Sequence, residues 1–474
     1  MSQKIRNKKS DTQNRFTIVA ILLAGSFLAI LNQTLLLTAT PHIMEDFQLT
    51  ENTAQWVTTI FMLINGIMIP LTAFFMETFT TRRLFLFSMI VFIIGTIICA
   101  FAYYFPILMI GRIVQAIGAG ILMPLMMTII MLIFPIERRG LALGIVGLVI
   151  SFAPALGPAI AGWLIEFLPW RALFYFIIPI AFIDIILAFF FMKNIIPRTF
   201  PKVDYPSIIL SVSGFGGLLY GFSSVGNYGW LHSGVLISLV VGTISLIAFI
   251  WRQLKLEEPI LEFRVFTYKI FTFATVIAMV TFTMLIAAET ILPIYMQVMA
   301  GFTAFESGMM MLPGAILMGI LSPFVGRIFD RIGVKWLLPT GLLIMTVTTI
   351  FFTNLTENTS FIYLTIVYAI RMIGIAMVSM PSTTASLNVL PKQLIPHGTA
   401  MTNTMRQVAA SIGTAFLITV MSLAARDPTV HGMRGLIHGV NIAFYVATAI
   451  TFLAFIFSFF VKDRKHVKET EKIA

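Results

Sequence analysis

The chain has 474 residues, of which 58% are hydrophobic and only 11% are charged, and its mean hydropathy is +0.96. A soluble globular domain has about 25% charged residues, so this composition excludes that class and predicts an integral membrane protein. The formal net charge of +11 comes largely from segments such as 4–15 and 462–472, where anionic lipid is the expected partner and nucleic acid is not.

Taking about 20 apolar residues per membrane span, the sequence predicts an all-α protein with roughly fourteen transmembrane helices. In chain order we expect them at 16–38, 54–76, 82–103, 105–134, 140–167, 170–192, 205–225, 233–251, 270–298, 304–325, 335–353, 361–384, 398–423 and 439–461.

The lysines and arginines are sorted between the gaps that separate these helices. Of the 31, all but six lie in the terminal tails or in every second loop. The exceptions are three arginines in intervening loops and three inside apolar or helix-like segments, namely Arg171, Arg426 and Arg434, and Arg112, Arg371 and Arg406. Basic residues of short loops are retained on the cytoplasmic side. We therefore expect a multi-pass protein of the plasma membrane with both termini in the cytoplasm.

Two long, basic interruptions set the predicted domain organisation. They bracket the seventh and eighth helices and contain the sequences KNIIPRTFPKVD and RQLKLEEPILEFRVFTYK. The division that follows is a six-helix bundle at 1–193, two inserted helices with cytoplasmic linkers at 194–269, and a second six-helix bundle with a cytoplasmic tail at 270–474.

A weak internal repeat relates the two sets of six helices. After its second helix the first set has AFFMETFTTRR at 73–83, and the second set has GRIFDRIGVK at 326–335. Arg112 in the fourth helix of the first set corresponds to Arg371 in the second. Internal repeats of this kind are how many transporters are built.

These residues resemble the major facilitator superfamily, and specifically its fourteen-helix drug:proton antiporters. The segment GRIFDRIGVK matches the cytoplasmic loop pattern GxxxDRxGxK through Gly326, Asp330, Arg331, Gly333 and Lys335. The resemblance implies that this motif controls gating.

The copy of this motif in the first half is degraded. Ala73, Glu77 and Thr80 stand where the pattern has Gly, Asp and Gly. Glu77 and Arg82 are the gating candidates that remain on that side.

The fifth helix contains APALGPAIAGW at 153–163, which resembles the antiporter signature through Gly157, Pro158 and Gly162. Glycine permits close contact between helices. Proline removes a backbone hydrogen bond and bends the helix. A gating bend and simple packing both remain open as its role.

The first helix contains LNQTLLLTATPHI at 31–43, which resembles the signature of the fourteen-helix family. Many members have an Asp where this chain has Asn32, and an Asn cannot titrate. Similar segments elsewhere include WRALFYFIIP, LPIYMQ and GTAMTNTMRQ, so the resemblance covers nearly the whole chain. The candidate substrate-binding residues are Asn32, Gln33, Gln115, Glu289, Asn403 and Arg406.

Two carboxylates lie inside predicted helices, Asp184 and Glu289. An ionised side chain at the centre of a helix costs about 2.5–3.5 kcal/mol on insertion scales, so such residues usually face a cavity or a partner. Glu289 is the first candidate for proton coupling and Asp184 the second. The alternative for Glu289 is a structural pair with an Arg, or a hydrogen-bonded neutral acid.

The resemblance places Arg112 in a proton-relay motif with Gln115 and Gly118. The alternative is structural, because an Arg can donate several hydrogen bonds to carbonyl groups of neighbouring helices.

Several other functions lack support in the sequence. No GxxxxGK[ST] loop and no HExxH pattern is present, so neither ATP-driven transport nor an enzyme is expected. No cofactor is expected either. The single Cys99 excludes an intrachain disulfide, and the six histidines are expected in loops or tails.

The sequence therefore predicts a proton-coupled exporter of amphipathic or lipophilic, often cationic, compounds that works by alternating access. Its expected partners are protons, small drug-like substrates and membrane lipids, and it is expected to be a monomer. One alternative is an exporter of one physiological solute, such as a siderophore, lipid or metabolite. A passive channel or a sensor is the alternative from another class, and it would show no proton dependence.

Overall fold

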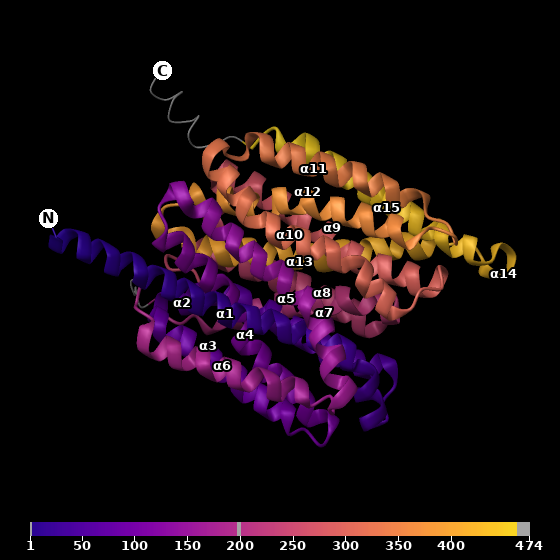
Figure 1. Ribbon diagram of the computed structural model, residues 1–474, viewed down its shortest axis with the longest axis horizontal. Coiled ribbons are helices and arrows are strands. Elements are labelled where there is room, and N and C mark those ends of the chain that lie inside the picture. The colour runs from indigo at the N-terminus through magenta and orange to yellow at the C-terminus, as the bar shows by residue number, and fades with distance from the viewer. Residues whose placement is uncertain (1, 197–200, 462–474) are drawn as a thin grey trace.

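The computed structural model describes residues 2–196 and 201–461, and this part of the chain is helical with connecting turns (Figure 1). It contains 14 helices long and apolar enough to cross a membrane. They are α1 (Ser2–Phe47), α2 (Glu51–Thr78), α3 (Thr81–Ala100), α4 (Phe105–Ile133), α5 (Arg139–Phe167), α6 (Ala172–Phe191), α7 (Tyr205–Tyr228), α8 (Ser233–Lys255), α9 (Lys269–Ile294), α10 (Ala304–Ile332), α11 (Val334–Phe351), α12 (Phe361–Asn388), α13 (Ile395–Ala424) and α15 (Met433–Ser458).

The structure corrects some predicted boundaries. α1 is much longer than the expected 16–38, and a short helix, α14 (Pro428–His431), precedes α15. The expectation that the histidines lie in loops or tails is wrong for His42, His397, His431 and His438, which lie in α1, α13, α14 and α15. The segment GRIFDRIGVK at 326–335, expected as a loop, is also mostly helix, since α10 continues to Ile332 before the chain turns.

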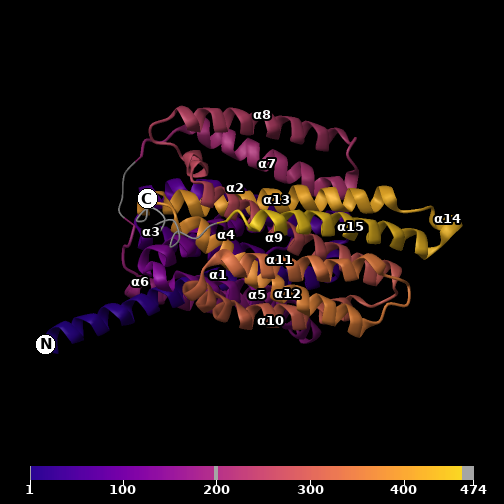
Figure 2. The same cartoon turned by 90° about the horizontal axis from the view of Figure 1, so that it is seen from above.

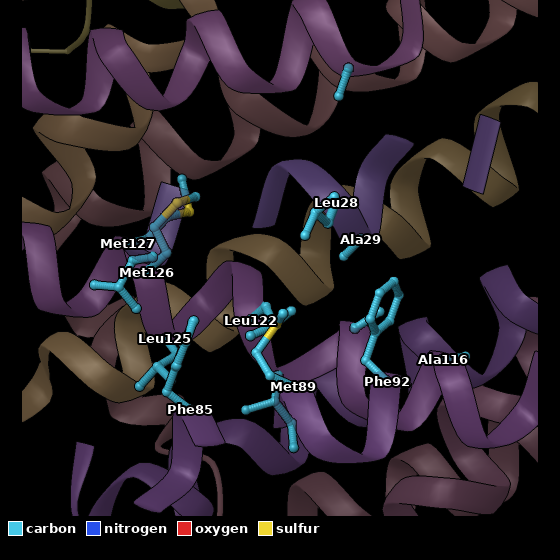
Figure 3. Packing of buried hydrophobic residues seen from close by; sticks show 14 of the residues in the cluster. Leu28, Ala29, Phe85, Met89, Phe92, Ala116, Leu122, Leu125, Met126 and Met127 are labelled. Carbon is cyan, nitrogen blue, oxygen red and sulfur yellow. The ribbon is translucent and has the colours of Figure 1, made fainter. Parts of the chain in front are cut away.

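Two groups of six helices pack mainly among themselves, α1–α6 in one and α9–α13 with α15 in the other. Each group surrounds a cluster of buried apolar side chains. Figure 3 shows part of the first cluster, where Leu28 of α1, Phe85 and Phe92 of α3, and Leu122 of α4 lie close together. We call α1–α6 the first half and α9–α15 the second half.

Glycines let equivalent helix pairs approach closely in both halves. A side chain at Gly95 or Gly111 would meet the backbone between α3 and α4, and one at Gly341 or Gly374 would meet the backbone between α11 and α12. Lipid tails are as apolar as the side chains, so close packing is a main source of helix association in a membrane. The internal repeat in the sequence is therefore matched by a repeated contact.

The two halves meet mainly through α5 against α10 and α2 against α13. We call the end of the bundle where α1 begins and α15 finishes the basal end, and the end that carries α14 the distal end (Figure 1). Near the basal end, side chains at Gly140, Gly144 or Gly326 would clash with the facing helix. Nearer the distal end, Gly162 of α5 and Gly308 of α10 have open space around them. The glycine contacts between α5 and α10 therefore bring their backbones closest near the basal end.

The remaining two long helices form a hairpin along one side of the bundle (Figure 2). α7 packs against α8, α2 and α13, and so bridges the two halves. Trp56 of α2 stacks on Tyr220 of α7 with ring centroids 5.7 Å apart. Trp230, in the turn after α7, donates a hydrogen bond to Thr419 of α13 at 2.8 Å. The hairpin thus covers the seam between α2 and α13.

Candidate functional site

Arg112 lies at the centre of a polar network inside the first half. Its Nη1 atom donates to Gln115 Oε1 at 2.7 Å and lies 3.5 Å from Asn32 Oδ1, and its Nε atom donates to the Val57 carbonyl at 3.0 Å. The guanidinium also stacks on Phe61, 4.2 Å from the ring centroid. Arg112 and Asn32 are both fully enclosed. The structure brings the three predicted residues Asn32, Arg112 and Gln115 together, and the network ties α4 to α1 and α2.

Arg371 occupies the related place in the second half, but its neighbouring groups differ from those of Arg112. Its Nη2 atom donates to the Met284 carbonyl of α9 at 2.8 Å, whereas Nε and Nη1 have no hydrogen-bond partner. The buried guanidinium attracts the carboxylate of Glu289, also on α9, without a hydrogen bond between them. A buried cation with unused donors therefore lies beside an acidic group.

Glu289 is exposed and lies near Arg371 of α12. Phe273 of α9 contacts Phe457 of α15. At 3.6 residues per turn, Glu289 lies about 160° around the helix from Phe273. Glu289 is therefore on roughly the opposite side of α9 from the contact that Phe273 makes with α15.

Asp184 is enclosed on the other side of the first half. Neither of its carboxylate oxygens has a hydrogen-bond partner. Its surroundings are α1 at Gly25 and α3 at Phe85 and Met89, which all lie around the same point. Asp184 therefore lies apart from Glu289, in an apolar setting that disfavours an ionised form.

The remaining predicted binding residues lie on α13 and α1. Asn403 donates to the Met127 sulfur of α4 at 3.3 Å, so it reaches across to the first half. Arg406, one turn further along α13, is 5% exposed and stacks on Phe282 of α9 with its Cζ atom 4.5 Å from the ring centroid. Gln33 is half-buried on α1.

Asp330 joins the two halves at the basal end. Its Oδ1 and Oδ2 atoms accept hydrogen bonds from the backbone amides of Gly140 and Leu141, at 2.7 and 2.9 Å. These amides belong to the first turn of α5, where backbone donors lack partners within the helix and the helix dipole favours negative charge. Gly140 and Gly326 allow the backbones of α5 and α10 to approach closely enough for this contact.

The degraded copy of the motif makes a different contact on the opposite side of the basal end. Glu77 Oε1 lies 2.9 Å from His397 Nε2, in the first turn of α13. The Nδ1 atom of His397 accepts a hydrogen bond from the backbone amide of Glu262 at 3.3 Å. Sequence reasoning missed His397 and Glu262. Their one available signal was that His397 follows Pro396 at the start of a predicted helix.

The other motif residues take varied positions. Arg82 is half-buried and donates to the Phe189 carbonyl, while Arg331 and Lys335 are exposed. Gly333 has φ of 75° between α10 and α11, a left-handed conformation that glycine adopts without steric cost.

The residues of the fifth-helix signature have different surroundings. Gly157 packs against Thr34 of α1, whereas Pro158 and Gly162 are exposed. Close packing therefore explains Gly157 but not Gly162.

The described residues contain no group of three or more His, Cys, Asp or Glu side chains that could hold a metal ion. The charged groups brought together are instead single acids and arginines on different helices. Such an arrangement can hold or release a proton and can bind a polar group within an apolar surrounding.

Comparisons with known proteins agree with this architecture. The family model of the Major Facilitator Superfamily matches residues 22–414. YcnB of Bacillus subtilis, an uncharacterized MFS-type transporter, is 54% identical over 97% of each chain. The lincomycin resistance protein LmrB of Listeria monocytogenes is 39% identical over 94% of this chain and 97% of its own.

Among solved structures, the human organic anion transporter MFSD10 has a TM-score of 0.69 at 14% identity, over 94% of this chain and 99% of that chain. This likeness concerns the fold alone. Family model, relatives and fold agree that this multi-pass membrane protein, a transporter and not an enzyme, belongs to the major facilitator superfamily.

Proposed function

We propose that this transporter exports amphipathic, lipophilic compounds in exchange for protons. The observation that carries the proposal is Glu289, an exposed acid within a membrane-spanning helix that lies near the buried Arg371 of α12. The name of LmrB, a lincomycin resistance protein 39% identical to this chain, supports a drug-like substrate.

The basal end is the cytoplasmic face in this proposal. Lys202, Arg138, Arg331 and Lys335 are exposed there, and basic residues of short loops remain on the cytoplasmic side. Both termini would then lie in the cytoplasm.

Alternating access would follow from rocking of the two halves. Asp330 with the first turn of α5, and Glu77 with His397, hold the basal ends of the halves together. Gly162 of α5 and Gly308 of α10, nearer the distal end, have open space around them. This arrangement corresponds to a state closed to the cytoplasm, and export requires the basal contacts to break and re-form in each cycle.

Glu289 would bind and release the proton, and Arg371 would stabilise its ionised form. A carboxylate that has lost its proton is stabilised by the nearby guanidinium, which has two unused donor atoms. A proton from outside would neutralise Glu289 and release the acid from that attraction. At about 150 mV, one inward charge contributes roughly 3.5 kcal/mol, enough for a gradient of a few hundredfold for a neutral substrate.

The test uses the full chain in proteoliposomes with an imposed pH gradient and ethidium as the probe. We expect ethidium transport that follows the gradient and stops when an uncoupler dissipates it. Transport that persists unchanged with the uncoupler would refute proton coupling. Absence of transport of any drug-like probe, with transport of one polar metabolite instead, would refute the substrate class.

A further inference from the structure

The acidic and basic side chains in the middle of the membrane spans are not paired one to one. Arg112 is surrounded by Asn32, Gln115 and a backbone carbonyl. Arg371 has the carboxylate of Glu289 beside it. Neither carboxylate oxygen of Asp184 has a hydrogen-bond partner in the described part of the chain, and α1 and α3 enclose the side chain. Of the three arginines Arg112, Arg371 and Arg406, which are all buried, Arg406 is therefore the one with neither a neighbouring carboxylate nor a polar network around it.

The contacts of Arg406 are few for a guanidinium that is 5% exposed. Its contact is the stacking on Phe282, and its five N–H donors have no hydrogen bond to any described residue. An unpaired charge within a membrane protein is costly and normally marks a path or a ligand. The ligand that satisfies a guanidinium best is a carboxylate, which accepts two parallel hydrogen bonds.

Neighbouring residues on α13 place Arg406 between the two halves. Asn403, one turn before it, contacts Met127 of α4. The side chain of Gln407 reaches Gly66 of α2. The α13 segment that carries Arg406 therefore faces α2, α4 and α9 together, where both halves can contact one molecule.

Glu289 lies on the same side of α9 as Phe282, seven residues further towards the distal end. Seven residues complete about two turns and rise about 10 Å. Arg406, which contacts Phe282, and Glu289, two helical turns away, thus lie along the same side of α9. The aromatic ring next to Arg406 adds a flat apolar surface.

We propose that this site prefers zwitterionic aromatic amphipaths, with the acidic group of the substrate on Arg406 and its positive group towards Glu289. This inference rests on the proposed export function and specifies its substrate class. A simple lipophilic cation would leave Arg406 unpaired and be repelled by it. Such a compound should therefore bind more weakly than a zwitterion of the same shape.

Rhodamine 110 and rhodamine 123 provide a matched pair of probes, because they share one cationic ring system. Rhodamine 110 has a free carboxylate where rhodamine 123 has the methyl ester. Binding to the purified full chain in nanodiscs is measured by fluorescence anisotropy, without any gradient. We expect rhodamine 110 to bind about tenfold more tightly than rhodamine 123, as an added charge-assisted pair implies.

Two variants assign the preference to the side chain. Arg406→Gln should weaken rhodamine 110 binding about tenfold and leave rhodamine 123 binding unchanged or stronger, which also shows that the variant is folded. Arg406→Lys, which keeps the charge but not the fork of donors, should retain part of the preference. Equal binding of the two dyes by the wild type, binding of neither, or an equal loss of both in Arg406→Gln, would overturn the inference.

The outcome is separable from the proposed function. Gradient-driven export of ethidium without a preference for rhodamine 110 refutes only the substrate class. A preference for rhodamine 110 without gradient-driven transport refutes only the coupling.

Discussion

His397 and Glu77, 320 residues apart in the chain, lie 2.9 Å apart through Nε2 and Oε1 and join α13 to α2. Because His397 Nδ1 accepts from the Glu262 amide, the ring proton is on Nε2, which donates to the carboxylate. One side chain thus connects the first half, the second half and the segment that follows the α7–α8 hairpin. Asp330 makes the related connection at the other seam through the amides of α5.

Asp330→Asn should loosen the basal end while leaving membrane insertion intact. A negative charge at a helix N-terminus contributes about 0.3–2 kcal/mol, so the balance between closed and open basal ends should shift roughly 2- to 30-fold, and transport should fall. Spin labels at Arg138 and Arg327, exposed positions in different halves, would report the distance between the basal ends.

Glu306→Gln is the matched control for Asp330→Asn. Glu306 accepts from the Thr303 amide at the first turn of its own helix, α10, and does not join the halves. Its loss should leave the distance distribution unchanged. Full transport and an unchanged distribution in Asp330→Asn would remove the gating role.

His397→Ala should free the Glu262 amide from α13. Loss of a hydrogen bond of about 1 kcal/mol predicts hydrogen exchange at residues 261–263 that is roughly five- to tenfold faster. Glu77→Ala removes the other contact of His397 and should leave exchange at Glu262 nearly unchanged. The same acceleration in both variants would mean that the Glu77 contact, rather than the ring of His397, positions this segment.

Glu289→Gln should abolish proton-driven efflux while substrate binding survives, at least for neutral substrates, because the amide keeps the shape but cannot release a proton. Asp184→Asn should be milder, since Asp184 is enclosed against α1 and α3. Proton release on addition of substrate to the purified protein distinguishes them. If Glu289→Gln still releases protons and pumps normally, coupling resides elsewhere, and Asp184 becomes the next candidate.

Stability at low pH should depend on Asp204, which links the start of α7 to the end of α8. Arg252 donates to both carboxylate oxygens at 2.7 and 2.8 Å, and these bonds hold the pKa of Asp204 below its ordinary value. The stabilisation is therefore complete above the unfolded-state pKa of about 3.9. It is lost as the pH falls through the lower, folded-state pKa.

The size of this effect is limited because Arg252 is 37% exposed. Such a pair contributes less than about 1 kcal/mol. Melting midpoints of the wild type should exceed those of Asp204→Asn by a constant amount above about pH 5, and the gap should close below about pH 4. Glu257→Gln, at an exposed carboxylate of the nearby linker, should show no such gap. A gap that persists at the lowest pH would assign the effect to packing.

Cysteines introduced at Leu231, Glu357 and Lys202 test the orientation in the membrane. Leu231 and Glu357 lie at the distal end and Lys202 at the basal end, and all three are exposed. An impermeant thiol reagent added to intact cells should label the first two and not the third. Protection at position 231 would contradict the assignment of α7 and α8 as membrane spans.

The sequence by itself determined the membrane class, the positions of the apolar helices and the family. These properties follow from local length and composition, since a span needs about 20 apolar residues regardless of its neighbours. It also showed that Asn32 cannot titrate, and the family resemblance placed Arg112 with Gln115, whose side chains the structure joins by a hydrogen bond. The sequence predicted the ends of helices less accurately, because α1 and α10 continue beyond their apolar parts.

Only the tertiary structure decided which charges have partners. Glu289 and Asp184 are both acids in apolar helices, yet Glu289 is exposed near Arg371 and Asp184 is enclosed without a hydrogen-bond partner among the described residues. Asp330 finds the amides of α5 and Glu77 finds His397 across hundreds of residues. The physical reason is that composition and periodicity describe one helix at a time, whereas the pairing of a buried charge depends on which face of another helix packs against it.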